Sequence, residues 1–176
     1  MAGIGILLRA GKDRDNRTDL KELWNHKEGR PFFKACMSCK RFKFLLQLMR
    51  IDNTLTRNDR IVSDKLAAFS EIWMLFNNVL RKYFVPECDI TCDEQLVGFR
   101  GKTPGWTYMP KKPRKYGVKI FWAAESNTGF ALNAIIYGGR NSTNQQNNLA
   151  HDIVMELMSL FFGSGRHVII IDTKFF

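Results

Sequence analysis

Long hydrophobic runs are missing from this sequence, and no apolar stretch approaches the roughly 18–20 residues that a membrane-spanning helix needs. The apolar start, Ile4 to Leu8, is too short for the core of a signal peptide, and no basic residue precedes it. We therefore expect a chain that has no membrane partner and stays inside the cell.

Cysteine is also scarce, with four residues in the chain: Cys36, Cys39, Cys88 and Cys92. Inside a cell they are expected to be reduced thiols. The spacing Cys36-x-x-Cys39 leaves open a zinc site that takes Cys88 and Cys92 as its second pair, but no glycine-rich knuckle flanks either pair. The interpretation that we favour is small apolar side chains inside packed elements.

Acidic residues are the third shortage. Lys and Arg number 27 against 17 Asp and Glu, a formal net charge of +10, while 45% hydrophobic residues indicate a globular chain. Such an excess favours a polyanionic partner, nucleic acid first and an acidic membrane second. The alternative is a basic protein whose charge only aids solubility.

Helical periodicity marks the first half of the chain. Residues 38–50 carry apolar side chains on one face, and Ser38 stands where a helix cap is expected. Residues 64–84 give the clearest helix, which ends before Pro86. Its apolar stripe repeats near a period of 3.6, and such a stripe is nearly always core. We predict burial for its members, Leu66, Phe69, Ile72, Trp73, Phe76, Leu80 and Phe84.

After Pro86 the pattern changes to strands. Three short β-branched or aromatic segments follow, with a hairpin turn at Ser126 to Gly129; they are 88–93, 117–124 and 129–137. A helix at 149–162 precedes a continuous apolar run, Val168 to Ile171, which is typical of a strand buried on both faces. The order β-β-β-α-β predicts an α/β fold whose last strand lies parallel to the first and beside it.

Two acids stand at strand ends in this arrangement. Asp93 lies near the end of the first strand and Asp172 ends the last one. If these strands are parallel neighbours, both carboxylates emerge at the same edge of the sheet. Two carboxylates can bridge a pair of Mg²⁺ ions, and such a pair stabilises the attacking and leaving oxygens in phosphoryl transfer. The alternative is that both acids simply face water.

A basic segment follows Asp93. From Gln95 to Ala124 there is no acid, and aromatic residues are interleaved with the cations: Trp106, Tyr108 and Tyr116. Cations neutralise phosphates, and rings can stack on bases or pack against sugars. A solvated basic loop is the alternative. The candidate DNA-binding residues are Arg100, Lys102, Lys111, Lys112, Arg114, Lys115 and Lys119.

At these residues the sequence resembles a known family. Asp93 to Lys102 (DEQLVGFRGK) is similar to the segment at the first catalytic aspartate of piggyBac-like transposases, and Tyr108 to Lys119 continues the likeness. Thr128 to Phe130 and Ile136 to Gly139 extend it. Upstream, residues 37–42 and 48–53 resemble the helical dimerisation and DNA-binding region of that family.

The resemblance implies a helical dimerisation and DNA-binding-like region at 1–86 and an RNase H-like catalytic domain at 87–176. It also implies three aspartates, two Mg²⁺ ions, and cleavage and strand transfer of DNA at TTAA sites in the nucleus. Asp93 matches the first aspartate and Asp172 the second. The expected fold class is therefore α/β, with a helical region followed by a partial RNase H-like core, β-β-β-α-β.

The sequence also departs from the family. The second acid is followed by Thr173-Lys174-Phe175-Phe176 where Asn and two aromatics are usual, and Glu125 stands where Asp is common. A third aspartate, the fifth strand of the core and the zinc domain have no counterpart in these 176 residues. We therefore expect an incomplete catalytic domain that is inactive alone.

Two functional hypotheses follow. The first is a transposase-derived protein that retains at most DNA binding, with DNA as partner and no small-molecule substrate. The second is a catalytically dead interaction or relic fragment that associates with its own copies, with a transposase chain or with other proteins.

Overall fold

The computed structural model describes residues 2–15, 18–99, 101, 106–113, 115–139, 149–161 and 168–171. The chain divides into two compact units, Met1–Arg50 and Ile51–Phe176. The boundary predicted between residues 86 and 87 falls inside the second unit, and the functional division that it stands for remains a prediction.

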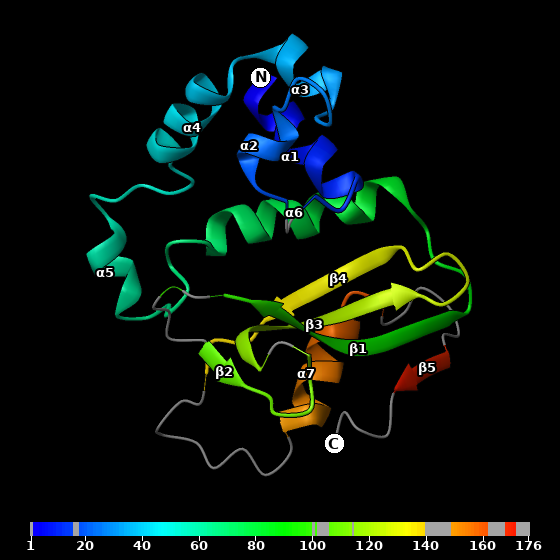
Figure 1. Ribbon diagram of the computed structural model, residues 1–176. Coiled ribbons are helices and arrows are strands. Elements are labelled where there is room, and N and C mark those ends of the chain that lie inside the picture. The colour runs from blue at the N-terminus through cyan, green and yellow to red at the C-terminus, as the bar shows by residue number, and fades with distance from the viewer. Residues whose placement is uncertain are drawn as a thin grey trace. The chain divides into compact units, whose positions relative to one another are not determined.

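The first unit is helical, with α1 (Ala2–Lys12), α2 (Leu20–Leu23), α3 (Pro31–Cys36) and α4 (Cys39–Leu48) (Figure 1). Trp24 is its centre: the indole stacks on Phe33 and Phe42 with ring centroids 5.2 Å and 5.1 Å away. Its Nε1–H donates to the carbonyl oxygen of Met37 over 2.8 Å. Ile6 and Leu23 complete the core, and aromatic burial of this kind dominates the stability of a small helical unit.

The predicted helix at 38–50 is confirmed as α4. Ser38 is its cap, and the Ser38 hydroxyl accepts a hydrogen bond from the backbone N–H of Arg41 over 3.3 Å. Helix α1 was not expected from the sequence, because Gly3, Gly5 and Gly11 interrupt its apolar pattern.

The second unit is a mixed sheet with helices. Its elements are α5 (Arg57–Ile61), α6 (Ser70–Tyr83), β1 (Asp89–Gly98), β2 (Trp106–Tyr108), β3 (Tyr116–Glu125), β4 (Ala131–Ile136), α7 (Leu149–Met158) and β5 (Val168–Ile171). β3 pairs antiparallel with β1, β2 and β4, while β5 pairs parallel with β1. The predicted order and the predicted parallel pairing of the first and last strands are confirmed; the short strand β2 was not predicted.

Helices α6 and α7 lie on opposite faces of this sheet (Figure 1). On β3, Phe121 and Ala123 point to one face, where they form a core with Ile153 and Leu157 of α7. Trp122 points to the other face and meets Trp73 and Phe76 of α6, with ring centroids 5.8 Å and 6.5 Å away. Alternation along β3 therefore assigns each residue to one face of the sheet, with α7 on one face and α6 on the other.

Helix α6 begins later than predicted, at Ser70. The Asp64 carboxylate accepts the backbone N–H of Leu66 over 2.8 Å, and this local turn competes with helix before residue 70. The predicted burial of the α6 stripe is wrong in part, since Phe69, Ile72 and Phe76 stay 38–40% exposed. Among the side chains of this helix that the structure describes, the buried one is polar, Asn77.

Asn77 binds the outer edge of β4. Its amide donates to the carbonyl oxygen of Ala134 over 2.8 Å and accepts the N–H of the same residue over 3.0 Å. The indole N–H of Trp73 donates to the same oxygen over 3.0 Å. The amide thus replaces the strand that would otherwise pair with β4 at this position.

Strand β5 has a neighbour on one side within the described part of the chain, namely β1. Val168, Ile169 and Ile170 are exposed by 57%, 39% and 47%, so the prediction of a strand buried on both faces is wrong for these residues. Burial depends on which elements cover a strand, and an apolar run does not specify them.

No helix in the described residues is long and apolar enough to cross a bilayer.

Candidate functional site

Asp93 lies on β1, opposite Trp122 of β3, so its side chain is on the α6 face of the sheet. The prediction that it lies near the end of the first strand is wrong, because β1 continues to Gly98 through its pairing with β3. The residue is exposed, and its Oδ1 accepts the backbone N–H of Glu94 over 2.6 Å. The residue before it, Cys92, pairs with Ile171 of β5. Asp172 is next after Ile171 in the chain, and it lies outside the described residues.

Glu94 points to the opposite face. Its carboxylate lies 2.5 Å from the Lys119 ammonium and 3.9 Å from that of Lys112. Lys112 also donates to the Glu94 carbonyl over 3.4 Å. Two of the cations expected to bind DNA are therefore engaged by an acid. The sequence alone could not reveal this pairing, because it requires the register of β1 against β3.

The remaining predicted cations differ in status. Lys111 and Lys115 are exposed, beside the strands β2 and β3. Arg100, Lys102 and Arg114 lie outside the described residues. Among the described cations of the segment, Lys111 and Lys115 are the ones that remain available to a polyanion.

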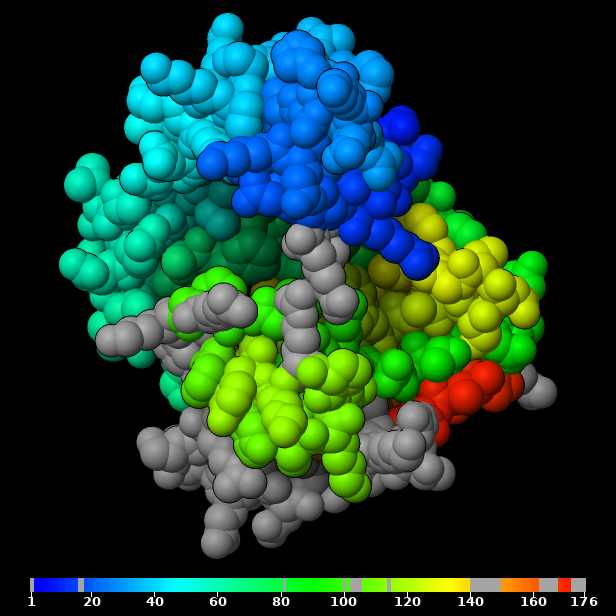
Figure 2. Space-filling view, in the orientation of Figure 1, coloured from blue at the N-terminus to red at the C-terminus, as the bar shows by residue number. Residues whose placement is uncertain are grey.

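The three predicted aromatic residues come together. Trp106 stacks on Tyr116 with centroids 4.7 Å apart and an interplanar angle of 8°, and Tyr108 contacts Tyr116 at 4.7 Å. The indole N–H of Trp106 donates to the Phe99 carbonyl over 3.1 Å, which fixes the ring. We call these three residues the ring ladder. The yellow-green atoms of this part of the chain form part of the visible surface (Figure 2).

Gln95 is a neighbour of Asp93 that sequence reasoning missed. Its side-chain oxygen accepts the indole N–H of Trp122 over 3.0 Å. Asp93, Gln95 and Trp122 therefore share one face of the sheet, since Asp93 pairs with Trp122 and Gln95 lies two positions further on β1.

Glu125, which stands where Asp is common in piggyBac-like transposases, is buried at the end of β3. Its Oε2 accepts the backbone N–H and the hydroxyl of Thr128 over 2.7 Å and 2.6 Å, and these bonds lower the pKa of the carboxyl. The hydrogen bonds to Glu125 close the predicted hairpin turn, which is confirmed and contains Gly129 at φ 68°. Because these hydrogen bonds tie Glu125 to the turn, we do not count it as a metal ligand beside Asp93.

The cysteines do not assemble a zinc site in the described residues, where no group of three or more His, Cys, Asp or Glu could hold a metal. Cys36 and Cys39 belong to the first unit, and Cys88 and Cys92 to the second. Cys92 packs in the α7 core, and burial raises the pKa of its thiol to about 11. This placement agrees with the packing interpretation for Cys92, whereas Cys88 is exposed, and the interpretation is wrong for that residue.

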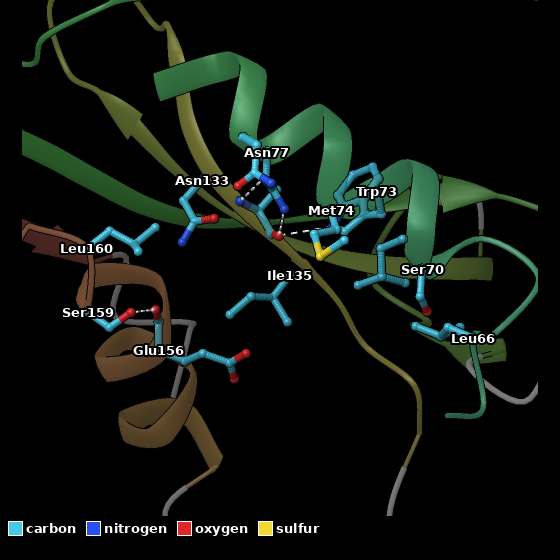
Figure 3. A pocket seen from close by; sticks show the side chains of 13 residues that line it. Leu66, Ser70, Trp73, Met74, Asn77, Asn133, Ile135, Glu156, Ser159 and Leu160 are labelled. Carbon is cyan, nitrogen blue, oxygen red and sulfur yellow. Dashed lines mark hydrogen bonds between the residues drawn. The ribbon is translucent and has the colours of Figure 1, made fainter. Parts of the chain in front are cut away.

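A cavity of ≈ 380 Å³ opens between α6, β4 and α7 (Figure 3). Asn77, Asn133 and Glu156 supply polar groups, and Met74, Ile135 and Leu160 supply apolar ones. Asn133 donates to the carbonyl oxygen of Leu157 on α7 over 2.9 Å. The lining contains neither Asp93 nor any described cation of the basic segment.

Comparison with known proteins agrees with this geometry. A family model described as "Transposase IS4" matches residues 1–175. The chain is also similar to the piggyBac transposase in a cryo-EM structure of its synaptic complex with hairpin DNA, with 29% identity and a TM-score of 0.83. The match covers 97% of this chain and 40% of that one, so the chain spans about two fifths of the relative's length.

A mixed sheet between two helices, an aspartate on its first strand and these matches define the class as a DDE-type transposase fold. The chain belongs to the Transposase IS4 family, and the resemblance to piggyBac-like transposases is confirmed.

Proposed function

We propose that this chain is a transposase-derived protein that binds DNA through the β1–β3 part of its sheet and retains at most that activity. The observation that carries the proposal is the exposed surface around Lys111, Lys115 and the ring ladder, all of them in the acid-free segment from Gln95 to Ala124, on a fold similar to a transposase in complex with DNA. Phosphate contacts by such cations give sequence-tolerant affinity. On this proposal the protein acts in the nucleus.

The proposed core is RNase H-like. Its support is the strand arrangement, in which β4, β3 and β1 are antiparallel and β5 lies parallel to β1 after the crossover helix α7. Within such a core Asp93 and Asp172 are the proposed metal ligands, and TTAA is the proposed target sequence.

The chemistry of Asp93 suits a hard cation such as Mg²⁺, because the group is an exposed carboxylate with one oxygen engaged by a backbone N–H. When bound, a pair of such ions stabilises the attacking and leaving oxygens of a phosphate. Glu94, the next residue on β1, faces Lys119 on the other side of the sheet and does not add a ligand. Asp93 and Asp172 alone would not fix two ions, because two-metal chemistry needs more ligands than two carboxylates supply.

The test is fluorescence anisotropy with duplex DNA over a series of salt concentrations. We expect weak binding whose affinity falls steeply as salt rises. The double substitution Lys111→Ala with Lys115→Ala should reduce the slope of log affinity against log salt by about two units, roughly one per lost phosphate contact.

The matched control is Lys21→Ala with Lys27→Ala, which removes the same charge from exposed positions of the first unit. An unchanged slope in the Lys111 and Lys115 variant would refute the proposed surface. It would direct attention to the basic residues of α4, Lys40, Arg41 and Lys43.

The second candidate function is association with transposase chains or with other copies of this chain. The observation that favours it is the exposed apolar strand β5, because exposed strand edges pair with other chains. Sedimentation analysis of the protein with and without DNA distinguishes the two candidates.

A further inference from the structure

The ring ladder is built across two strands. Tyr108 pairs directly with Tyr116, whereas Trp106 pairs with Val118 and reaches Tyr116 diagonally. Tyr116 contacts both other rings, so it lies between them and leaves an outer ring face at each end of the ladder. Cross-strand aromatic pairs stabilise a hairpin, yet these rings remain 49%, 53% and 49% exposed for Trp106, Tyr108 and Tyr116.

The ladder lies on the same face of the sheet as Asp93. Tyr116, Val118 and Trp122 alternate on β3, and Asp93 pairs with Trp122 while Val97 pairs with Val118. Asp93 and Val97 are four positions apart on β1, which corresponds to about 13 Å at the rise of a strand. Val97 and Phe99 are exposed by 42% and 44% and extend this apolar surface toward the ladder.

The charges around the ladder favour a polyanion. Lys111 and Lys115 lie in the connection between Tyr108 and Tyr116, and both are exposed. Glu94, the acid of β1 that precedes the segment, is on the opposite face and is bound to Lys119 and Lys112. Flat rings beside free cations match a nucleotide, which has both a π-face and a phosphate.

We propose that the ring ladder is a stacking platform for unpaired bases of a DNA strand, held on the same sheet face as Asp93. This inference rests on the proposed DNA-binding function and adds that the bound DNA is locally single-stranded. In a duplex the base faces are stacked on one another, and only the base edges are accessible in the grooves. A base can stack on an outer ring face of the ladder only if its own face is not already covered by a neighbouring base. Lys111 and Lys115 then contact the adjoining phosphates.

The test compares duplex DNA with the same duplex carrying a short single-stranded gap, labelled with 2-aminopurine in the gap. We expect tighter binding of the gapped DNA and quenching of the 2-aminopurine fluorescence on binding. Trp106→Leu and Tyr108→Leu should each weaken gapped-DNA binding by roughly 5- to 100-fold and restore the fluorescence, the range expected for loss of one stacked base.

The matched control is Tyr83→Leu, which removes an exposed aromatic ring from α6. Tyr108→Leu guards against a folding effect, because it leaves the bond from Trp106 to the Phe99 carbonyl in place. Circular dichroism and thermal unfolding confirm that each variant is folded.

The outcomes separate this proposal from the one on which it rests. Equal binding of gapped and intact duplex, with a salt slope that still depends on Lys111 and Lys115, overturns the stacking platform and leaves DNA binding in place. Absence of binding to either DNA overturns both. Loss of self-association in the ladder variants, without an effect on base fluorescence, shows instead that the rings contact a second copy of the chain.

Discussion

Gly117 shows how tightly a single position can be constrained. It is buried on β3 and pairs with Gly98 of β1, and a Cβ at residue 117 would overlap the carbonyl oxygen of Val97. The two strands approach each other here because neither residue has a side chain. Tyr116 of the ring ladder directly precedes Gly117, so this close approach also supports the proposed DNA surface.

We therefore expect Gly117→Ala to destabilise the second unit by about 1–3 kcal/mol, the usual cost of overpacking. The measurement is urea unfolding followed by tryptophan fluorescence. Gly5→Ala in α1 is the control, since nothing lies within 4 Å of its added Cβ and alanine favours helix. A Gly117→Ala protein as stable as the parent would show that β1 and β3 can separate at little cost.

The environment of Glu125 predicts that the stability of the fold depends on pH. Hydrogen bonds from the hydroxyl and the backbone N–H of Thr128 hold its pKa below the usual value of 4.5. A carboxyl with a lowered folded-state pKa stabilises the fold above its unfolded pKa, and this contribution is lost as the pH falls through the folded pKa. Thr128→Ala should therefore lower the Tm at neutral pH, and the difference should shrink in acid below about pH 4.5.

Thr128→Ser keeps the hydroxyl and serves as the control for that experiment. A Tm difference between Thr128→Ala and the parent that stays constant from pH 7 to pH 3 would mean that the hydroxyl acts through packing instead of through the carboxylate.

At the scale of elements, the sequence predicts the order of the strands better than it predicts which of their residues are buried. The β-branched segments and the turn at Ser126 to Gly129 specify β1, β3 and β4, because those signals are local. The pairing of Glu94 with Lys119 and the exposure of β5 are not local, since both depend on which strands and helices become neighbours. For the same reason the sequence could identify Asp93 as a candidate but not its surroundings.

The edge of β4 depends on one side chain from α6. Asn77→Ala leaves the N–H of Ala134 without its partner, and we expect a loss of about 1–3 kcal/mol in the free energy of unfolding. The adjacent Asn78 is exposed, so Asn78→Ala is the control and should change stability by less than about 0.5 kcal/mol. Equal effects of the two substitutions in chemical denaturation would contradict the role assigned to Asn77.

Strand β5 predicts self-association of the 176-residue chain. Ile170 pairs with Thr91, on the face away from α7, whereas Ile171 packs against the α7 core. Ile170→Lys should reduce association, because a charge at an exposed edge opposes strand pairing. Sedimentation velocity over a range of concentrations measures this. If Ile170→Lys associates as strongly as the parent while remaining folded, β5 is not the contact.

At the scale of the whole molecule, we expect no cutting or joining of DNA by this polypeptide alone. Two-metal chemistry needs ligands that hold both ions in a productive geometry, and the proposed ligands Asp93 and Asp172 supply at most two carboxylates. The measurement is a nicking assay with Mg²⁺ or Mn²⁺ on DNA that carries TTAA-flanked ends. Metal-dependent cleavage that disappears in Asp93→Ala would overturn this expectation, and equal background in both proteins would support it.

The amide of Asn77 also has a consequence for symmetry. It occupies the outer edge of β4 at Ala134, whereas the outer edge of β5 has no strand beside it among the described residues. Head-to-tail stacking of sheets would need both edges free, and it would propagate into a filament. Pairing of β5 with β5 of a second copy, related by a two-fold axis, would instead be complete after two chains. The amide of Asn77 therefore favours this closed contact over head-to-tail growth through β4 at Ala134.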